Sequence, residues 1–215
     1  MTKKVEKITV DIQAARLPQD LERYAQKALD LGATRAAVIK AADIPVDERV
    51  TLKCQIPRCF GYGVGAHCPP NTLKPGELRD ILQKYKWAVL FTLDVPPEVI
   101  VRDKATIKER VAAYQQVYKL VSELESLAFY DGHYLAFGFG AGSCRHTFCA
   151  QEETCAAMEG KRCRVSLRSR PSMEAVGIDV YQLVARHGWD IYPIGSGAKP
   201  ADMPKGVLAG VVIVQ

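Results

Sequence analysis

The sequence lacks any apolar run long enough to cross a membrane. Its longest apolar stretches, Trp87–Leu93 and Val207–Val214, fall well short of the roughly 20 residues that a spanning helix needs. The N-terminal residues Met1–Lys7 are charged, and no apolar segment follows them, so we expect no secretory signal. These absences predict a protein of the reducing cytoplasm that does not contact a membrane.

The chain also lacks a strong charge imbalance, internal repeats and low-complexity linkers. Its 215 residues include 29 Lys or Arg and 24 Asp or Glu, and a net charge of +5 does not indicate nucleic-acid binding. No Ser-His-Asp or phosphate-loop motif is present, and the loose G-x-G-x-G at Gly138–Gly142 has no Rossmann context. The length suits one domain, which we predict to span residues 1–215.

Hydrophobic periodicity predicts an α/β fold in which helices pack on a single twisted sheet of four or five strands. Strands are expected at 8–12, 33–40, 87–95, 133–139 and 207–214. Helices are expected at 17–31, 75–85, 103–129, 171–176 and 180–187. The uninterrupted apolar run at 87–95 indicates a buried central strand. We place Pro18 in the first turn of its helix, Gly32 just after that helix, and Asp179 at the N-cap of the last one.

All seven cysteines fall into two groups. The first group is Cys54, Cys59 and Cys68, and the second group is Cys144, Cys149, Cys155 and Cys163. An odd number of cysteines in a reducing compartment fits a disulfide framework poorly. Thiolates are instead soft ligands that suit iron–sulfur clusters or zinc. We therefore predict that cysteine-rich loops at 54–68 and 144–163 carry metal clusters.

The second group supplies four thiolates, the full protein complement of one 4Fe-4S cluster. Zinc is the alternative metal, but structural zinc sites favour closely spaced C-x2–4-C pairs, and only the first pair of this group qualifies. Gly138, Gly140 and Gly142 precede the group. They either let the backbone and its amides approach sulfur or merely form a turn.

The first group supplies three thiolates, which leaves one iron of a cubane without a protein thiolate. An open metal position is where a substrate can bind. His67 is a candidate fourth ligand here, and His146 is the equivalent candidate beside Cys144. Both histidines can equally be exposed neighbours of the cysteines.

Basic residues gather around the last cysteine: Lys161, Arg162, Arg164, Arg168 and Arg170. They can offset the negative charge of thiolate-bound clusters or form a docking patch for an acidic redox partner. The alternative is an ordinary solvated basic face.

Three runs resemble a known family: Cys59-Phe-Gly-Tyr-Gly leading to Cys68-Pro-Pro, Gly-Ser-Cys144, and Arg-Pro-Ser-Met-Glu-Ala-Val-Gly-Ile-Asp-Val at 170–180. They are similar to the small prokaryotic predicted metal-binding proteins, a family of unknown function. The resemblance runs from about Cys54 to the helix after Asp179 and implies a cysteine-rich iron–sulfur protein without a settled reaction. The first gap in each cysteine group, Cys54 to Cys59 and Cys144 to Cys149, is wider than in the family pattern. The resemblance is therefore compatible with either one cluster or two.

These observations predict a cytoplasmic iron–sulfur redox protein. Its four-cysteine cluster would transfer electrons, and its three-cysteine cluster would offer an open iron to a substrate. One alternative is a pure electron carrier or redox subunit, and another is a zinc-stabilised interaction module without enzymatic activity. The expected partner is a redox protein or a small-molecule substrate.

Overall fold

The computed structural model describes residues 7–101, 106–195 and 197–215. The helices are α1 (Val10–Asp30), α2 (Glu48–Gln55), α3 (Pro75–Leu82), α4 (Pro97–Ile100), α5 (Ile107–Tyr130), α6 (Cys144–Phe148) and α7 (Val180–Arg186). The strands are β1 (Arg35–Lys40), β2 (Trp87–Val95), β3 (Phe137–Phe139) and β4 (Gly206–Val214). Among the described helices, none combines the length and the apolar character needed to span a membrane.

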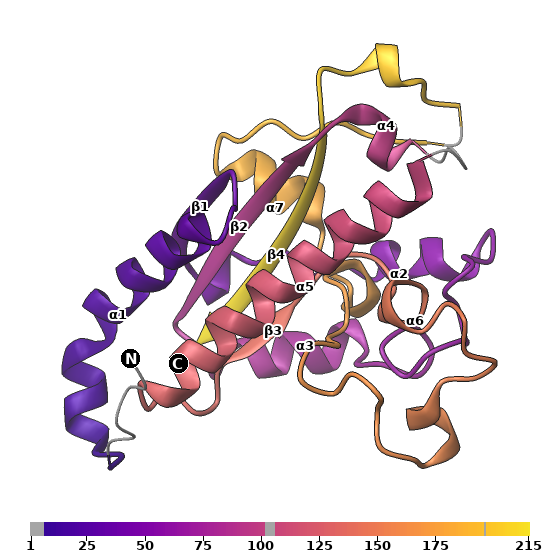
Figure 1. Ribbon diagram of the computed structural model, residues 1–215. Coiled ribbons are helices and arrows are strands. Elements are labelled where there is room, and N and C mark those ends of the chain that lie inside the picture. The colour runs from indigo at the N-terminus through magenta and orange to yellow at the C-terminus, as the bar shows by residue number, and fades with distance from the viewer. Residues whose placement is uncertain (1–6, 102–105, 196) are drawn as a thin grey trace.

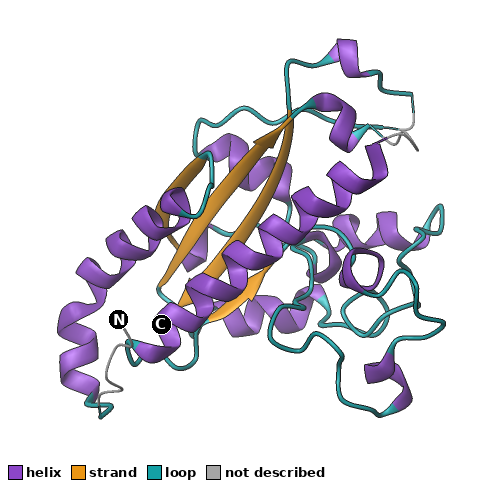
Figure 2. Ribbon diagram, in the orientation of Figure 1, coloured by secondary structure: helices purple, strands orange, loops and turns teal. Residues whose placement is uncertain are grey.

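The strands form one antiparallel sheet in the order β1-β2-β4-β3 (Figure 2). β2 and β4 pair along their full lengths, with Trp87 opposite Val214 and Val95 opposite Gly206. Both strands are interior, so both of their faces are covered, which accounts for their continuous apolar sequences. The prediction that 87–95 is a buried central strand is confirmed.

Helices cover both faces of the sheet. Phe91 and Val212 point into one apolar cluster with residues of α1 and α5, whereas Leu90 and Ile213 point into another with residues of α3 and α7. Figure 1 shows α1 and α5 crossing in front of the sheet and α7 behind it. Alternation of side chains along each strand divides the core in this way. The predicted mixed α/β fold with a single sheet is confirmed.

The strand predicted at 8–12 is wrong, because α1 already begins at Val10. Gln13, Leu17 and Leu21 are all buried, and their spacing of four places them on one face of the helix. A five-residue apolar alternation was too short to exclude this longer helical pattern. Pro18 consequently lies inside α1 rather than in its first turn.

The end of α1 follows the prediction. Gly32 has a φ of +100°, and the amides of Gly32 and Ala33 donate to the carbonyls of Leu29 and Ala28, both at 2.9 Å. This is the Schellman arrangement that favours glycine just past a helix. The helix predicted at 75–85 is shorter, as α3, and the strand predicted at 33–40 begins at Arg35.

Three other predicted elements are shorter than expected or lie partly outside the described residues. The strand predicted at 133–139 is reduced to β3, because His133–Ala136 forms a turn closed by a 3.0 Å hydrogen bond. The helix predicted at 171–176 is only a 3-10 turn at Glu174–Val176. Asp103, the predicted start of the longest helix, lies outside the described residues, and α5 is described from Ile107.

Candidate metal centre

The second group of cysteines begins where β3 leaves the sheet. β3 ends at Phe139, and Cys144 opens α6 four residues beyond Gly140. The Gly140 amide donates to the Pro171 carbonyl at 2.9 Å, and the Met173 amide donates to the Gly140 carbonyl at 3.0 Å. Ser172 forms a parallel bridge with Gly140, so the Arg-Pro-Ser part of the run is extended rather than helical, and it holds the turn that presents Cys144.

The glycines before Cys144 let this turn pack directly against α5. A methyl group on Gly138 would lie 2.2 Å from Cγ1 of Val121, and one on Gly142 would lie 2.7 Å from the ring of Tyr114. Gly142 also has a φ of +69°, a conformation that residues with a side chain rarely adopt. Packing against α5 therefore explains both positions without a contact to sulfur.

The structure gathers the whole second group around one small cavity of about 20 Å³. Cys144, Cys149, Cys155 and Cys163 all line it, together with His67 from the first cysteine-rich segment. Arg145 and Arg164 also contribute to its wall. The four cysteines of residues 144–163 thus lie around one cavity, on a five-residue helix, a 3-10 turn and loops.

The first group lies against the second. Sγ of Cys68 is 3.6 Å from Oγ of Ser143, the residue before Cys144. The amide of Ala66 donates a hydrogen bond to the sulfur of Cys155. Within the first group, the Cys59 amide donates to the Cys54 carbonyl at 2.9 Å. The two segments, about eighty residues apart in the sequence, therefore form one cysteine-rich region.

The thiols are gathered but do not converge on a point. Within residues 7–101, 106–195 and 197–215, no three His, Cys, Asp or Glu side chains are arranged to hold a metal ion. The donor set nevertheless fits a soft metal, because four cysteines line one cavity and every one of the seven is a free thiol. A cavity of about 20 Å³ accommodates about one water-sized centre, so a four-iron cluster requires the loops to move apart.

Burial keeps most of these thiols protonated. It raises the pKa of Cys144 to about 12 and that of Cys54 to about 11, and neighbouring cysteines add to both shifts. Cys155 differs: burial opposes its ionisation, but the amides of Ala66 and two other residues donate to its sulfur and lower its pKa overall. A bound cation would supply the positive charge that stabilises clustered thiolates, so binding of a metal here would be coupled to deprotonation of the cysteines.

The two candidate histidines differ in position. His67 lies at the wall of the four-cysteine cavity, where burial and then the charge of Arg170 lower its pKa and favour the neutral imidazole that metals bind. His146 places Nδ1 3.1 Å from Oγ of Ser143 and packs its ring edge-on against Phe60, with centroids 4.6 Å apart. Sequence reasoning assigned His67 to the first group, whereas the fold turns it towards the second.

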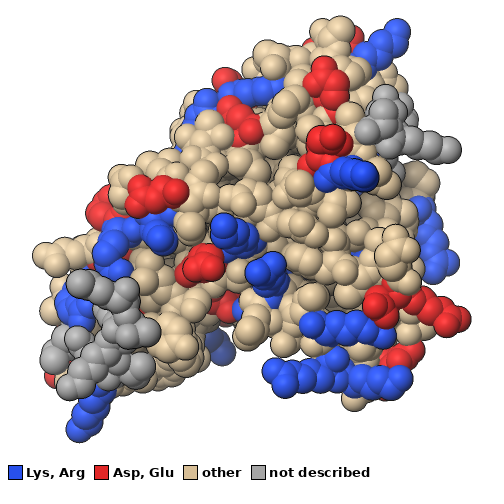
Figure 3. All heavy atoms as spheres, in the orientation of Figure 1, with Lys and Arg blue, Asp and Glu red and all other residues tan. Residues whose placement is uncertain are grey.

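Part of the predicted basic patch is neutralised by carboxylates. Lys161 pairs with Glu159 at 2.8 Å, Arg164 with Glu152 at 3.1 Å, and Arg170 with Glu125. Arg162 and Arg168 are exposed and have no ion pair within the described part of the chain. Figure 3 shows acidic and basic side chains intermingled at the lower right, where Figure 1 places the orange segment of the second group.

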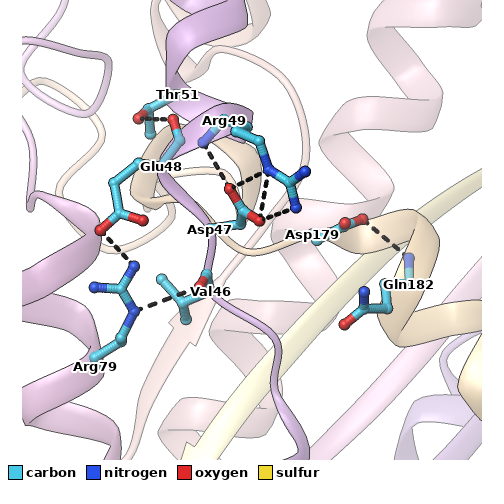
Figure 4. A network of polar contacts seen from close by, with 8 residues as sticks. All are labelled: Val46, Asp47, Glu48, Arg49, Thr51, Arg79, Asp179 and Gln182. Atoms are coloured by element: carbon cyan, nitrogen blue, oxygen red, sulfur yellow. Dashed lines mark hydrogen bonds and ion pairs between the residues drawn. The ribbon is translucent and has the colours of Figure 1, made fainter.

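Sequence reasoning missed α2, the helix that carries Cys54. Asp47 caps it, accepting from the Arg49 amide at 2.8 Å, and this was the available signal. The Asp47 amide donates to the Gly177 carbonyl at 2.8 Å, and the Asp179 amide donates to the Pro45 carbonyl at 2.9 Å. Figure 4 shows this polar region, with Asp179 capping α7 nearby. The 170–180 run thus contacts the approaches to both cysteine groups.

A family model described as "Predicted metal-binding protein (DUF2284)" matches residues 37–209, which include both cysteine groups. No curated protein and no solved structure is significantly similar to the chain.

Proposed function

The chain belongs to the predicted metal-binding protein family DUF2284, and on that premise we propose that it is an iron–sulfur redox protein of the cytoplasm. The observation that carries the proposal is the single cavity lined by all four cysteines of the second group. Four thiolates are the number that one 4Fe-4S cluster takes from a protein. The free state of all seven thiols is compatible with a reducing compartment.

The residues around this cavity have separate roles in the proposal. The four cysteines bind the cluster through their sulfur atoms. The Ala66 amide donates a hydrogen bond to the sulfur of Cys155 and so favours its thiolate. Arg145 and Arg164 on the wall offset the negative charge of the thiolates. A bound cluster supplies one-electron transfer, with a potential set partly by such charges and hydrogen bonds.

We extend the proposal to the first group. Cys54, Cys59 and Cys68 would hold a second cluster, one iron of which has no cysteine from this group and is available to a small-molecule substrate. The contact between Cys68 and Ser143 supports two centres placed side by side. Because His67 lines the other cavity, it is better placed to ligate there than to close the three-cysteine site.

The size of the cavity favours a second candidate. About 20 Å³ suits a single ion without movement of the loops, and zinc with four cysteine ligands forms a closed tetrahedral site. The protein would then be a zinc-stabilised interaction module with no redox activity.

Anaerobic purification of three proteins separates the candidates: the wild type, Cys155→Ser and Cys59→Ser. We expect a brown wild-type protein whose visible absorption bleaches on reduction. Each variant should lose about half of the iron, because each removes a ligand from a different group. Ser166→Ala, an exposed substitution in the same loop as Cys163, is the control and should retain all the iron. If the wild-type protein is colourless and contains zinc, and if only Cys155→Ser loses that zinc, the result favours the zinc module.

A further inference from the structure

A second and larger cavity, of about 440 Å³, adjoins the four-cysteine cavity. Arg145 and Cys155 line both cavities, so they form a shared wall. This volume lies within the range of about 300–1,000 Å³ that small-molecule sites occupy. A molecule bound there would contact one of the proposed metal ligands directly.

The wall of this larger cavity combines charged and apolar groups. Arg145 and His146 come from α6, whereas Glu153 comes from the loop after Cys149. Val64 and Met158 supply apolar surface and are 39% and 47% exposed, more than large apolar side chains with packed neighbours. Small-molecule sites commonly have this mixture of apolar walls and a few polar groups that fix orientation.

Within the described residues, Arg145 forms no ion pair with a carboxylate, and Glu153 forms none with a basic side chain. Arg145 donates a hydrogen bond to the backbone carbonyl of Glu152, a neutral group. Glu153 is exposed and has neither a hydrogen bond nor an ion pair in that same part of the chain. Glu159, by contrast, is paired with Lys161 at 2.8 Å. The cavity therefore offers one cation and one anion to a ligand.

We propose that this cavity binds a small amino-acid-like zwitterion, whose carboxylate pairs with Arg145 and whose ammonium group pairs with Glu153. A guanidinium binds a carboxylate through two parallel hydrogen bonds, and a charge removed from water needs an opposite charge. Val64 and Met158 would contact the ligand's side chain. This inference rests on the proposed function in one respect: the zwitterion is the substrate class of the proposed metal centre. Binding of the zwitterion to the cavity itself requires no metal.

The direct test titrates the anaerobically purified protein with pools of L-amino acids and follows ligand resonances by NMR. For each amino acid that binds, the corresponding acid without the amino group and the corresponding amine without the carboxylate are the matched probes. We expect the zwitterion to bind at least tenfold more tightly than either probe. Arg145→Gln and Glu153→Gln should each weaken it at least tenfold, whereas Glu123→Gln on the exposed face of α5 should have no effect. Equal binding of the probes, unchanged binding in both variants, or no binding by any amino acid overturns the inference.

Metal analysis of the same samples separates this inference from the proposed function. An iron–sulfur protein that binds no amino acid overturns the inference alone. A protein without iron that binds an amino acid through Arg145 and Glu153 overturns the proposed function alone. Because Arg145→Gln can also disturb the shared wall, Val64→Trp provides a second variant, whose larger side chain should narrow the cavity and weaken binding at least tenfold while metal content stays unchanged. Full binding in folded Val64→Trp counts against the site.

Discussion

At the scale of single residues, the candidate centre depends on close contact between backbone and side chain. Gly142 has a positive φ and lies against Tyr114, and the amide of Ala66 reaches the sulfur of Cys155. These contacts join the cysteine loops to α5 and to each other. Glycine is needed at position 142 for two reasons: the backbone has a positive φ, and a side chain would collide with Tyr114. The contribution of each reason to stability can be measured separately.

Gly142→Ala and Gly188→Ala form a matched pair for this purpose. Both glycines have nearly the same φ, +69° and +70°, but an added methyl group meets Tyr114 at position 142 and no atom within 4 Å at position 188. We expect Gly188→Ala to lower the free energy of unfolding by about 1–2 kcal/mol, because only the strained backbone conformation contributes at that position. Gly142→Ala should lower the free energy of unfolding by about 1–3 kcal/mol more, because the added methyl group also collides with the ring of Tyr114. Denaturant unfolding measures both, and equal losses would show that Tyr114 simply moves aside.

At the scale of elements, α2 is held in place by its first turn. Val46 and Ile178 form an isolated antiparallel bridge, and the carboxylate of Asp47 accepts from Arg49. Glu48 and Arg79 form an ion pair that joins α2 to α3 (Figure 4). The position of Cys54 at the end of α2 therefore depends on polar contacts at its beginning.

This dependence predicts a response to acid. Hydrogen bonds from the side chain and backbone of Arg49 lower the pKa of Asp47 from 3.8 to about 2. A pKa lowered by folding means that the cap stabilises α2 fully above about pH 4 and that the stabilisation is lost as the pH falls through 2. We expect the Asp47 carboxyl resonance to titrate near pH 2 and the α2 amides to lose protection over the same range. Asp47→Asn, which still caps but does not ionise, should remove the part of this pH dependence that comes from the cap and leave the part that comes from the Glu48–Arg79 pair. An Asp47 midpoint near 3.8 would contradict the account.

The sequence predicted some elements well and others badly for identifiable reasons. β2 and β4 were found because a strand covered on both faces is apolar throughout. α2 was missed because none of its residues is buried, so it has no apolar stripe to detect. The grouping of the second-group cysteines was predicted, but the approach of His67 to them was not, because it depends on how two distant loops meet.

At the scale of the whole molecule, the candidate centre lies outside the hydrophobic core. The two apolar clusters on the faces of the sheet include no residue from 144–170. Figure 1 shows the second cysteine segment projecting at the lower right, beyond α5 and the sheet. The sheet and its covering helices therefore have their own source of stability, whereas we expect the cysteine loops to gain stability from the proposed metal.

Limited proteolysis tests this division. Cys155→Ser removes a proposed metal ligand and the sulfur that accepts a hydrogen bond from the Ala66 amide. We therefore expect trypsin to cleave 150–168 at least several-fold faster than in the metal-loaded wild type. Leu167 is 80% exposed, so this segment has little packing to protect it without metal. Fragments that contain β2, α5 and β4 should remain resistant. A digestion pattern identical to that of the wild type would show that the loops hold their structure without metal.

The central claim is that the cysteine region binds an iron–sulfur cluster, and metal and sulfide analysis of the anaerobically purified wild-type protein tests it most directly. We expect about four iron and four acid-labile sulfide per chain for the four-cysteine site, and about eight of each if the first group also holds a cluster. Iron and sulfide should appear in equal amounts, because both belong to the same cofactor. Stoichiometric zinc with negligible iron and sulfide would contradict the claim and identify the chain as a zinc protein.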